Sequence, residues 1–127
     1  MYKLIIQGTL AGMNEFINAE RTHRLKGAKM KKSAETIVRC AIRQQLSGIK
    51  PKTPVWFDYC FIEPNRRRDK DNISAFARKV IQDSFVKEGI IENDGWKHIE
   101  GYMDTFDVDP ENPRIEVTLL EPEEERE

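Results

Sequence analysis

The sequence has few residues that could cross-link the chain or bind a soft metal ion. It contains two cysteines, of which Cys40 falls in a helical pattern and Cys60 in a strand-like pattern. Both positions suit small buried side chains, so we expect neither a disulfide nor a cysteine-ligated metal. The two histidines, His23 and His98, lack the Cys/His spacing typical of zinc sites, which leaves them surface or backbone-bonding roles.

Long apolar runs, repeats and linkers are also missing. No stretch approaches the ~20 apolar residues of a membrane-spanning helix, and the N-terminal stretch MYKLIIQGTLAGMNEF contains no signal-peptide cleavage pattern. We therefore expect a soluble, cytoplasmic protein with no membrane partner. One domain is predicted for residues 1–120, followed at residues 121–127 (EPEEERE) by an acidic, disordered tail.

Charged residues are plentiful but unevenly distributed. The net charge is −1, yet residues 1–68 carry 14 Lys and Arg against 5 Asp and Glu, whereas residues 69–127 carry 7 against 17. A basic half of this kind predicts a surface for a polyanion, with the acids reserved for another task. The alternative is that the two halves neutralise each other in the fold, and composition does not separate these interpretations.

The apolar periodicity predicts an α/β fold with a small mixed sheet. Strands are expected at residues 3–7, near residues 96–107 and at residues 115–119. A central strand is expected at residues 55–62, where VWFDYCFI is apolar on both faces apart from one aspartate. Residues 8–32 have little periodicity and predict a long basic loop that can include a helical turn. Loops of this length are often functional.

Two main helices are expected to pack on this sheet. The first takes Ser33 as its N-cap and ends at Gly48. The second begins at Asp69 or Asp71, carries a nearly ideal apolar stripe and ends at Gly89. Both aspartates therefore fall at a junction between the central strand and the second helix.

The stretch RRRDKDN at residues 66–72 places three arginines next to two aspartates. Asp94, in the later turn GIIENDGW, joins Asp69 and Asp71 if the chain folds back after Gly89. Three clustered carboxylates repel one another unless a cation is present, and their hard oxygen atoms suit Mg²⁺. The pattern therefore predicts a site for Mg²⁺, with Mn²⁺ as a substitute, that acts on a phosphodiester.

Further residues complete this candidate site. At ~100° per residue, Asn72, Lys79 and Asp83 fall on one flank of the predicted helix. Lys79 would supply positive charge to the phosphoryl oxygens in the transition state, and Asn72, Asp83 and Asn93 are assigned supporting roles. DNA phosphates are expected to contact the basic residues of the motif and of the predicted loop: Arg66, Arg67, Arg68, Arg21, Arg24, Lys29, Lys31 and Lys32.

Each part of this pattern also has a purely structural interpretation. One aspartate can be an N-cap, Lys79 and Asp83 can be an ordinary i,i+4 surface pair, the arginine run can be a solvated patch, and NDG can be a turn. The conjunction of these features is what favours a catalytic site. A calcium EF-hand is excluded because the sixth and twelfth positions counted from Asp69 are Ser74 and Val80.

These motifs resemble the RusA family of Holliday junction resolvases, which are dimeric, Mg²⁺-dependent endonucleases often carried by prophages. The similarity rests on RRRDKDN, on the pair Lys79 and Asp83, on GIIEND, on an Asn-containing basic segment near the N-terminus and on the closing stretch ENPRIEVTLLE. It extends over nearly the whole chain. Two positions depart from the family pattern: about one extra helical turn separates Asp71 from Lys79, and Asn93 stands where the family often has Asp.

The resemblance implies a RusA-like α/β fold and a symmetric homodimer with two active sites that cut branched DNA in recombination and repair. It implies that Asp69, Asp71 and Asp94 bind the metal and act in catalysis, that Lys79 is the catalytic lysine, and that Arg68 contacts the substrate. A two-fold enzyme suits a four-way junction, which presents two equivalent strands.

Three functional hypotheses follow. The leading one is a Mg²⁺-dependent, structure-selective DNA endonuclease that resolves four-way (Holliday) junctions by paired symmetric nicks. The first alternative is a non-catalytic nucleic-acid binding module related to the resolvases, which the extra helical turn and Asn93 would favour. The second alternative is an interaction protein whose acidic half docks a basic partner.

Overall fold

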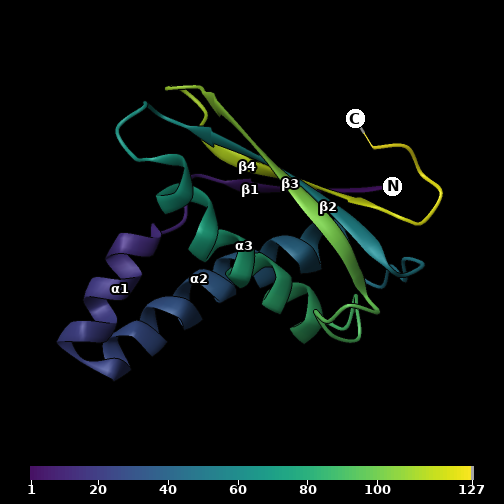
Figure 1. The fold of residues 1–127 in the computed structure, drawn as a ribbon, viewed down its shortest axis with the longest axis horizontal. Coiled ribbons are helices and arrows are strands. Elements are labelled where there is room, and N and C mark those ends of the chain that lie inside the picture. The colour runs from purple at the N-terminus through teal and green to yellow at the C-terminus, as the bar shows by residue number, and fades with distance from the viewer. Residues whose placement is uncertain (127) are drawn as a thin grey trace.

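The structure of the chain, a computed structural model, describes residues 1–126. Helices and strands follow one another in the order β-α-α-β-α-β-β (Figure 1). Their bounds are β1 Tyr2–Gln7, α1 Met13–Thr22, α2 Arg24–Gln45, β2 Val55–Glu63, α3 Lys70–Lys87, β3 Ile99–Val108 and β4 Arg114–Leu120. The four predicted strands and both predicted helices are therefore present, although several boundaries differ.

The four strands form one mixed sheet in the order β1-β4-β2-β3. β4 pairs antiparallel with β1 and with β2, whereas β3 pairs parallel with β2. β2 is therefore an interior strand, as its two apolar faces predicted. The prediction of a mixed α/β fold is confirmed.

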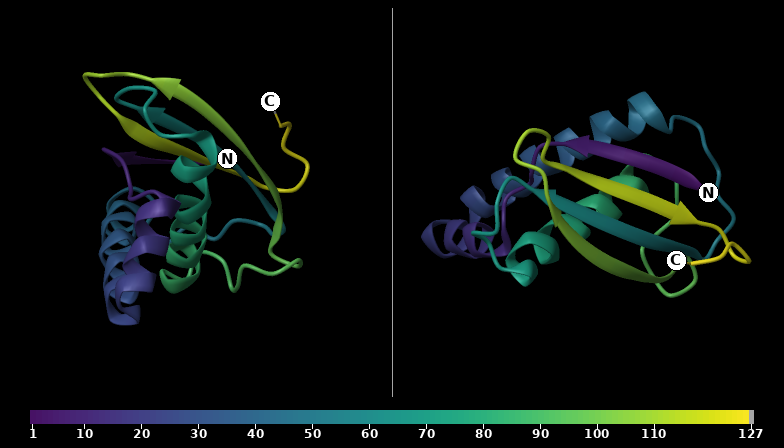
Figure 2. Two further views of the ribbon diagram at one scale, coloured as in Figure 1. Left: turned by 60° about the vertical axis from the view of Figure 1, so that its left-hand side comes forward. Right: turned by 90° about the horizontal axis from the view of Figure 1, so that it is seen from above.

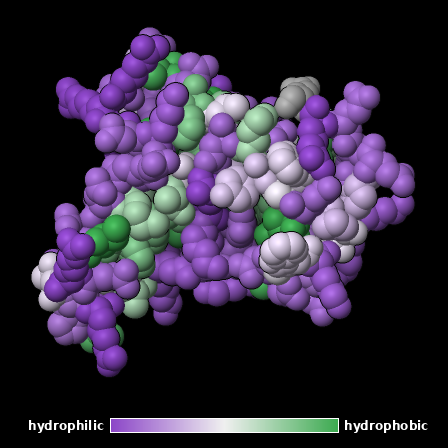
Figure 3. Space-filling view, in the orientation of Figure 1, coloured by the Kyte–Doolittle hydropathy of each residue, from purple (hydrophilic) through white to green (hydrophobic). Residues whose placement is uncertain are grey.

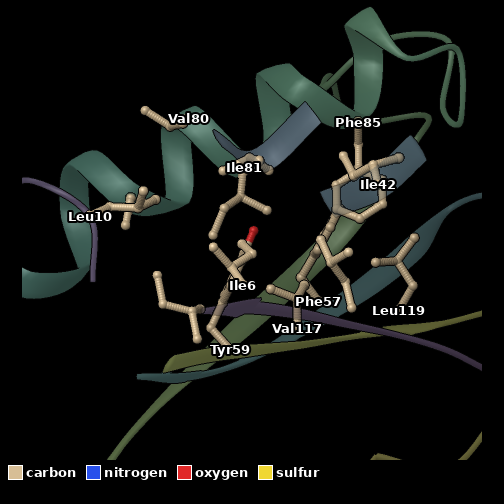
Figure 4. Packing of buried hydrophobic residues seen from close by; sticks show 14 of the residues in the cluster. Ile6, Leu10, Ile42, Phe57, Tyr59, Val80, Ile81, Phe85, Val117 and Leu119 are labelled. Atoms are coloured by element: carbon tan, nitrogen blue, oxygen red, sulfur yellow. The ribbon is translucent and has the colours of Figure 1, made fainter. Parts of the chain in front are cut away.

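The helices all lie on one face of this sheet, and the other face carries no helix (Figure 2). Alternate residues of a strand point to the same face, so Phe57 and Tyr59 of β2 both turn toward the helices and are buried. Figure 4 shows Ile42 of α2 together with Ile81 and Phe85 of α3 on the same side of the sheet as these rings. The core lies between the sheet and the helices α2 and α3.

The segment before Ser33 is helical, and the predicted loop was therefore wrong. α1 occupies Met13–Thr22, and α2 begins at Arg24, nine residues before the predicted N-cap. The two helices form a tight hairpin, since a Cβ atom added at Gly27 would lie 2.4 Å from Cγ of Glu20. The hairpin extends past the end of the sheet (Figure 1), and its larger apolar residues Met13, Phe16 and Met30 are only partly buried against the core, so its apolar periodicity is weak. A third helix thus joins the two that were expected.

The two edge strands of the sheet differ in whether a side chain hydrogen-bonds their outward backbone groups. At the β1 edge, Gln45 at the end of α2 bonds both backbone groups of Ile5: its Oε1 accepts from the N–H and its Nε2 donates to the C=O, each at 2.8 Å. At the β3 edge, no other strand of residues 1–126 pairs with the outer side, and Tyr102 and Met103 are 48% and 41% exposed. An unpaired edge is a place where another strand can add.

The surface of the molecule is mostly polar. Hydrophilic residues cover most of the face shown in Figure 3, with smaller hydrophobic patches between them, in keeping with the 34% of residues that are charged. None of the helices in residues 1–126 has the length and apolar character that crossing a membrane requires.

The residues after β4 run back toward the N-terminus. Glu121 accepts a hydrogen bond from the backbone N–H of Lys52 at 2.7 Å, and Glu124 pairs with the N-terminal amino group at 2.9 Å. Arg126 lies over the ring of Trp56 and forms an ion pair with Glu100 at 2.8 Å. Disorder of the tail in solution stays a prediction, and residue 127 lies outside the described residues.

Candidate functional site

Arg68, the last arginine of RRRDKDN, is used to build the junction between β2 and α3. Its Nε and Nη2 donate to the two carboxylate oxygens of Glu63, each at 2.9 Å, and its Nη1 donates to the backbone oxygen of Leu10 at 3.0 Å. Glu63 is the last residue of β2 and its side chain is 8% exposed. Arg68 therefore neutralises a buried carboxylate and ties three segments together, and these contacts use three of its five N–H donors.

Asn72 also serves the scaffold. Its Oδ1 accepts a hydrogen bond at 2.8 Å from the backbone N–H of Asn14, in the first turn of α1. The contact is close, because a Cβ atom added at Gly12 would lie 2.6 Å from Asn72 Oδ1. Asn72 thus supplies the side-chain cap that Gly12, the N-cap residue of α1, does not have, and it fixes the start of α1 against the start of α3.

Asp69 and Asp71, which lie between Arg68 and Asn72 in the sequence, have no side-chain partner among residues 1–126. Asp69 is the N-cap residue of α3, but its side chain makes no capping hydrogen bond. Asp71 lies in the first turn of α3, where the helix dipole favours a negative charge. Both residues are exposed, and neither carboxylate forms an ion pair or hydrogen bond with any of residues 1–126. An N-cap role therefore does not account for either carboxylate.

A cavity of about 880 Å³ opens beside the two aspartates. Asp69 and Asp71 line it together with Arg66 and Lys70, so that free carboxylates and cationic groups share one concave surface. Lys70 also lies over the ring of Phe106 on β3, with its Nζ 5.6 Å from the ring centroid. The arrangement can hold a cation at the carboxylates and phosphate groups at the basic side chains.

Asp107 of β3 lines the same cavity and was not found by sequence reasoning. It lies opposite Ile62 of β2, because β3 runs parallel to β2 and both strands end at the cavity. A parallel neighbour cannot be inferred from adjacent sequence, so the sequence contained no signal that would place Asp107 beside Asp69 and Asp71.

Asp94 is held elsewhere, by Lys79. Its Oδ2 lies 3.1 Å from Lys79 Nζ, which also lies 3.3 Å from Oδ1 of Asp83. Hydrogen bonding to Asp94 raises the pKa of Lys79, and the same bond lowers the pKa of Asp94. The ordinary i,i+4 interpretation of Lys79 and Asp83 is confirmed, with Asp94 as an additional partner.

The expected gathering of Asp69, Asp71 and Asp94 does not occur within one chain. Lys79 lies eight residues beyond Asp71 on α3, a rise of ~12 Å. Asp94 follows the buried Ile91 by three positions and pairs with Lys79, and it does not line the cavity at Asp69 and Asp71. No group of three His, Cys, Asp or Glu residues that could hold a metal ion occurs among residues 1–126.

Asn93 and Asp83, assigned supporting roles, have partners within the chain. Asn93 Oδ1 accepts from the backbone N–H of Gly95 at 2.8 Å and lies 3.0 Å from His98 Nδ1. It thereby shapes the turn, as the NDG pattern allowed. Asp83 pairs with Lys31 of α2 at 2.8 Å, which joins α2 to α3. These contacts place both residues in the scaffold around Lys79 rather than at the cavity.

The remaining basic residues lie in two places. Arg66 and Arg67 are exposed on the loop beside the cavity. A second group lies along the α1–α2 hairpin, where all members but Lys31 are exposed: Arg21, Arg24, Lys29, Lys31 and Lys32. α1 begins beside Asn72 and is ten residues long. The connection between α1 and α2 therefore lies ~15 Å along the α1 axis from the start of α3.

The donor atoms at the cavity fit Mg²⁺. This ion prefers oxygen ligands and is commonly held by one or two carboxylates, with water molecules and substrate phosphate completing its coordination. Asp69 and Asp71 offer two exposed carboxylates without competing partners, which meets this requirement. Asp69 and Asp71 would therefore hold the ion, whereas Asp94 lies outside the cavity lining.

Neither a scan against protein-family models nor a search of curated proteins found a match to the chain. The resemblance to the RusA resolvases therefore stays a prediction that rests on the sequence motifs.

Proposed function

We propose that the chain is a Mg²⁺-dependent, structure-selective DNA endonuclease that resolves four-way junctions by paired nicks, in the manner of the RusA resolvases. The cut would occur at the cavity beside the start of α3. Recombination and repair of DNA would be its setting. The proposal includes DNA as partner, Mg²⁺ or Mn²⁺ as cofactor and a homodimer as the working form.

One observation carries this proposal. Within five consecutive residues, Arg68 and Asn72 are consumed by scaffold contacts, whereas Asp69 and Asp71 keep free carboxylates that line a cavity. The two carboxylates stand at the start of α3, where the helix dipole favours negative charge, and no contact within residues 1–126 uses them. Such an arrangement is typical of a site that binds a cation, and Arg66 and Lys70 at the same cavity supply contacts for phosphate.

The roles of the residues follow from their positions. Bound Mg²⁺ would polarise the phosphodiester and lower the pKa of a bound water. Asp69 and Asp71 would hold the ion, and Arg66 and Lys70 would position the flanking phosphates. Lys79, which Asp94 and Asp83 hold, would act through the scaffold or on DNA outside the cavity rather than at the cut phosphodiester.

The homodimer is supported by the unpaired β3 edge. Its exposed Tyr102 and Met103 offer apolar area beside free backbone groups, which a second copy could cover. Sedimentation velocity of the full chain over a range of concentrations measures the state of association directly.

The test is cleavage of a labelled four-way junction in Mg²⁺ by the wild-type chain and by Asp71→Asn. We expect paired symmetric nicks with the wild type, and loss of at least ~100-fold of the rate in the variant, because a metal ligand loses its charge. Junction binding, measured by mobility shift in Ca²⁺, should survive in the variant because the phosphate contacts remain.

The matched control is Asp58→Asn, which changes a carboxylate on the helix-free face of the sheet. Asp58 accepts a hydrogen bond from Trp56 Nε1 at 2.8 Å, and an asparagine oxygen can do the same. Its rate should equal that of the wild type. Equal cleavage by Asp71→Asn and wild type, or cleavage of linear duplex as fast as of the junction, would contradict the proposal.

A non-catalytic nucleic-acid binding module is the second candidate. It is favoured by the pairing of Asp94 with Lys79 and by the lack of a three-residue metal group among residues 1–126. Tight junction binding without any cut in Mg²⁺ or Mn²⁺, and no effect of either ion on the unfolding temperature, would select this candidate over the nuclease.

A further inference from the structure

A groove of about 420 Å³ lies between α2 and the connection from β1 to α1. Leu10 and Ala34 form buried parts of its wall, and Met30 is partly buried beside them. Ile37 of α2 lies at the same groove with 50% of its surface exposed. A single exposed apolar residue is ordinary, but Ile37 continues an apolar wall that reaches the core. The groove is therefore a concave apolar surface that is open to solvent.

The positions on α2 place cations, but no acid, at this groove. At ~100° per residue, Lys26 and Ile37 fall within ~20° of each other on the helix. Glu35, the one acidic residue of α2, lies on the opposite side and pairs with Lys87 of α3 at 2.8 Å. Lys29 completes the cationic lining, and the groove has no acidic lining residue within residues 1–126.

The charge around the groove is positive. Residues 13–45, which form α1, α2 and their connection, carry eight Lys and Arg against three Glu. Ion pairs to Asp83 or Glu88 use three of these cations, which leaves five without an ion pair to any of residues 1–126: Arg21, Arg24, Lys26, Lys29 and Lys32. Both lysines at the groove are among the five. A ligand with anionic groups is therefore favoured.

The lining of the groove favours a peptide over a nucleic acid. Proteins that bind single strands stack the bases on aromatic side chains, and no aromatic residue of the described chain lines this groove. Duplex phosphates could contact the lysines but would leave the apolar wall uncovered. A peptide supplies both parts, with apolar side chains for the wall and carboxylates for the lysines. The hydroxyl groups of Thr9 and Ser33, which have no hydrogen bond to residues 1–126, are free for its backbone.

The groove is formed before any ligand binds. The side chain of Leu10 is anchored in the core, and its backbone oxygen accepts a hydrogen bond from Arg68 Nη1 at 3.0 Å. The opposite wall is the helix α2. A ligand would therefore not have to order the connection between β1 and α1, which avoids an entropic cost of binding.

The acidic stretch at residues 121–126 of the chain itself does not suit the groove. EPEEER has no large apolar side chain that could cover the wall. Glu121 accepts from Lys52 N, and Arg126 lies over the ring of Trp56, so that these residues are engaged elsewhere. The occupant that fits is a segment of another protein.

We propose that this groove binds an acidic peptide segment of another protein, with an apolar side chain against Ile37 and carboxylates at Lys26 and Lys29. The inference goes beyond the proposed function, because the groove shares no lining residue with the cavity at Asp69 and Asp71. A bound segment would attach the chain to a partner and leave the cavity free for DNA.

The first experiment selects binders of the immobilised full chain from a random dodecapeptide library displayed on phage. We expect the enriched peptides to combine Asp or Glu with Leu, Ile or Phe. Their affinity, measured by fluorescence anisotropy, should fall as salt is added, because salt screens the lysines. Enrichment of no binding peptide, or of peptides without an acidic excess, overturns the inference.

Substitutions at the groove supply the second measurement. Ile37→Gln should weaken binding of the enriched peptides between about 3-fold and about 12-fold, since half of the side chain is still available for burial. Lys26→Gln should weaken it by up to about 5-fold, the range for one exposed ion pair. Ile37→Leu should bind nearly as well as the wild type. The matched control is Lys52→Gln, which changes an exposed lysine away from the groove and should have no effect.

The outcomes separate the possible occupants. Wild-type affinity of Ile37→Gln for the enriched peptides overturns the inference. Loss of oligo(dT) or junction affinity in Ile37→Gln would assign the groove to nucleic acid, and weaker self-association in sedimentation velocity would assign it to a second copy. Either result overturns the peptide site. An unchanged unfolding temperature shows that Ile37→Gln is folded.

The peptide site and the nuclease can fail independently. Junction cleavage by Ile37→Gln should equal that of the wild type, because Ile37 lies outside the cavity. Failure of peptide binding with normal cleavage leaves the nuclease standing. Peptide binding that depends on Ile37, in a chain that does not cut, keeps the groove and rejects the nuclease.

Discussion

Arg68 and Asp69 are adjacent in the sequence, but only the side chain of Arg68 is hydrogen-bonded within the chain described by the structure. Arg68 has three hydrogen bonds inside the chain, to Glu63 and Leu10, whereas the carboxylate of Asp69 has none with residues 1–126. The sequence pattern assigned Asp69 to the metal ion, and the resemblance to the RusA family assigned Arg68 to the substrate. The difference arises from Glu63, a buried carboxylate at the end of β2 that requires a cation.

This contrast gives a prediction for two neighbouring substitutions. Arg68→Ala should lower the free energy of unfolding by about 3 kcal/mol, because it leaves Glu63 buried and unpaired. Asp69→Ala should change it by less than about 0.5 kcal/mol, since no capping bond is lost, while junction cleavage falls sharply. Urea unfolding and the cleavage assay measure the two effects. A large loss of stability in Asp69→Ala would show that the carboxylate has a structural partner.

At the scale of helices and strands, the sequence predicted an element correctly where a clear apolar pattern runs along its whole length. The apolar stripe of α3 and the two apolar faces of β2 located both elements, since each meets the core along its whole length. The prediction failed for residues 13–32, where only Ala19 and Gly27 are fully buried and the sequence therefore has no clear apolar stripe. The site was located in part: the β2–α3 junction was predictable, but the parallel neighbour that brings Asp107 was not.

The ion pairs between α2 and α3 give a second prediction. Arg43 and Arg39 of α2 donate to the two oxygens of Glu88 at 2.7 and 2.6 Å, and these bonds hold the pKa of Glu88 below its ordinary value. The stabilising effect is therefore present at neutral pH and is lost as the pH falls through the lowered pKa. Glu88→Gln should reduce stability by about 1 kcal/mol at neutral pH.

The measurement is the urea midpoint of the wild type and of Glu88→Gln at about pH 7 and about pH 3. The difference should shrink at the lower pH, where the carboxylate of the wild type takes up a proton. A difference that stays constant with pH would mean that the ion pairs do not carry the effect.

At the scale of the whole molecule, the uneven distribution of charge predicts how DNA binding responds to salt. Each lysine or arginine that neutralises a phosphate contributes about one unit to the slope of log affinity against log salt. Arg66→Ala should lower that slope by about 1, because Arg66 is exposed at the cavity. Lys31→Ala should lower it less, because Lys31 already pairs with Asp83. Equal slopes for both variants and the wild type would show that Arg66 does not contact DNA phosphates.

The amide of Gln45 on Ile5 has a consequence for how many copies can join. A sheet with two unpaired edge strands can pair with another chain at each edge and grow into a filament. A sheet with one unpaired edge strand can pair with one other chain only. Gln45 occupies the backbone groups of Ile5 at the β1 edge, so a strand added there would lack the hydrogen bonds at Ile5. In the proposed homodimer, this one glutamine would therefore favour pairing through β3, and a closed pair of chains over a growing filament.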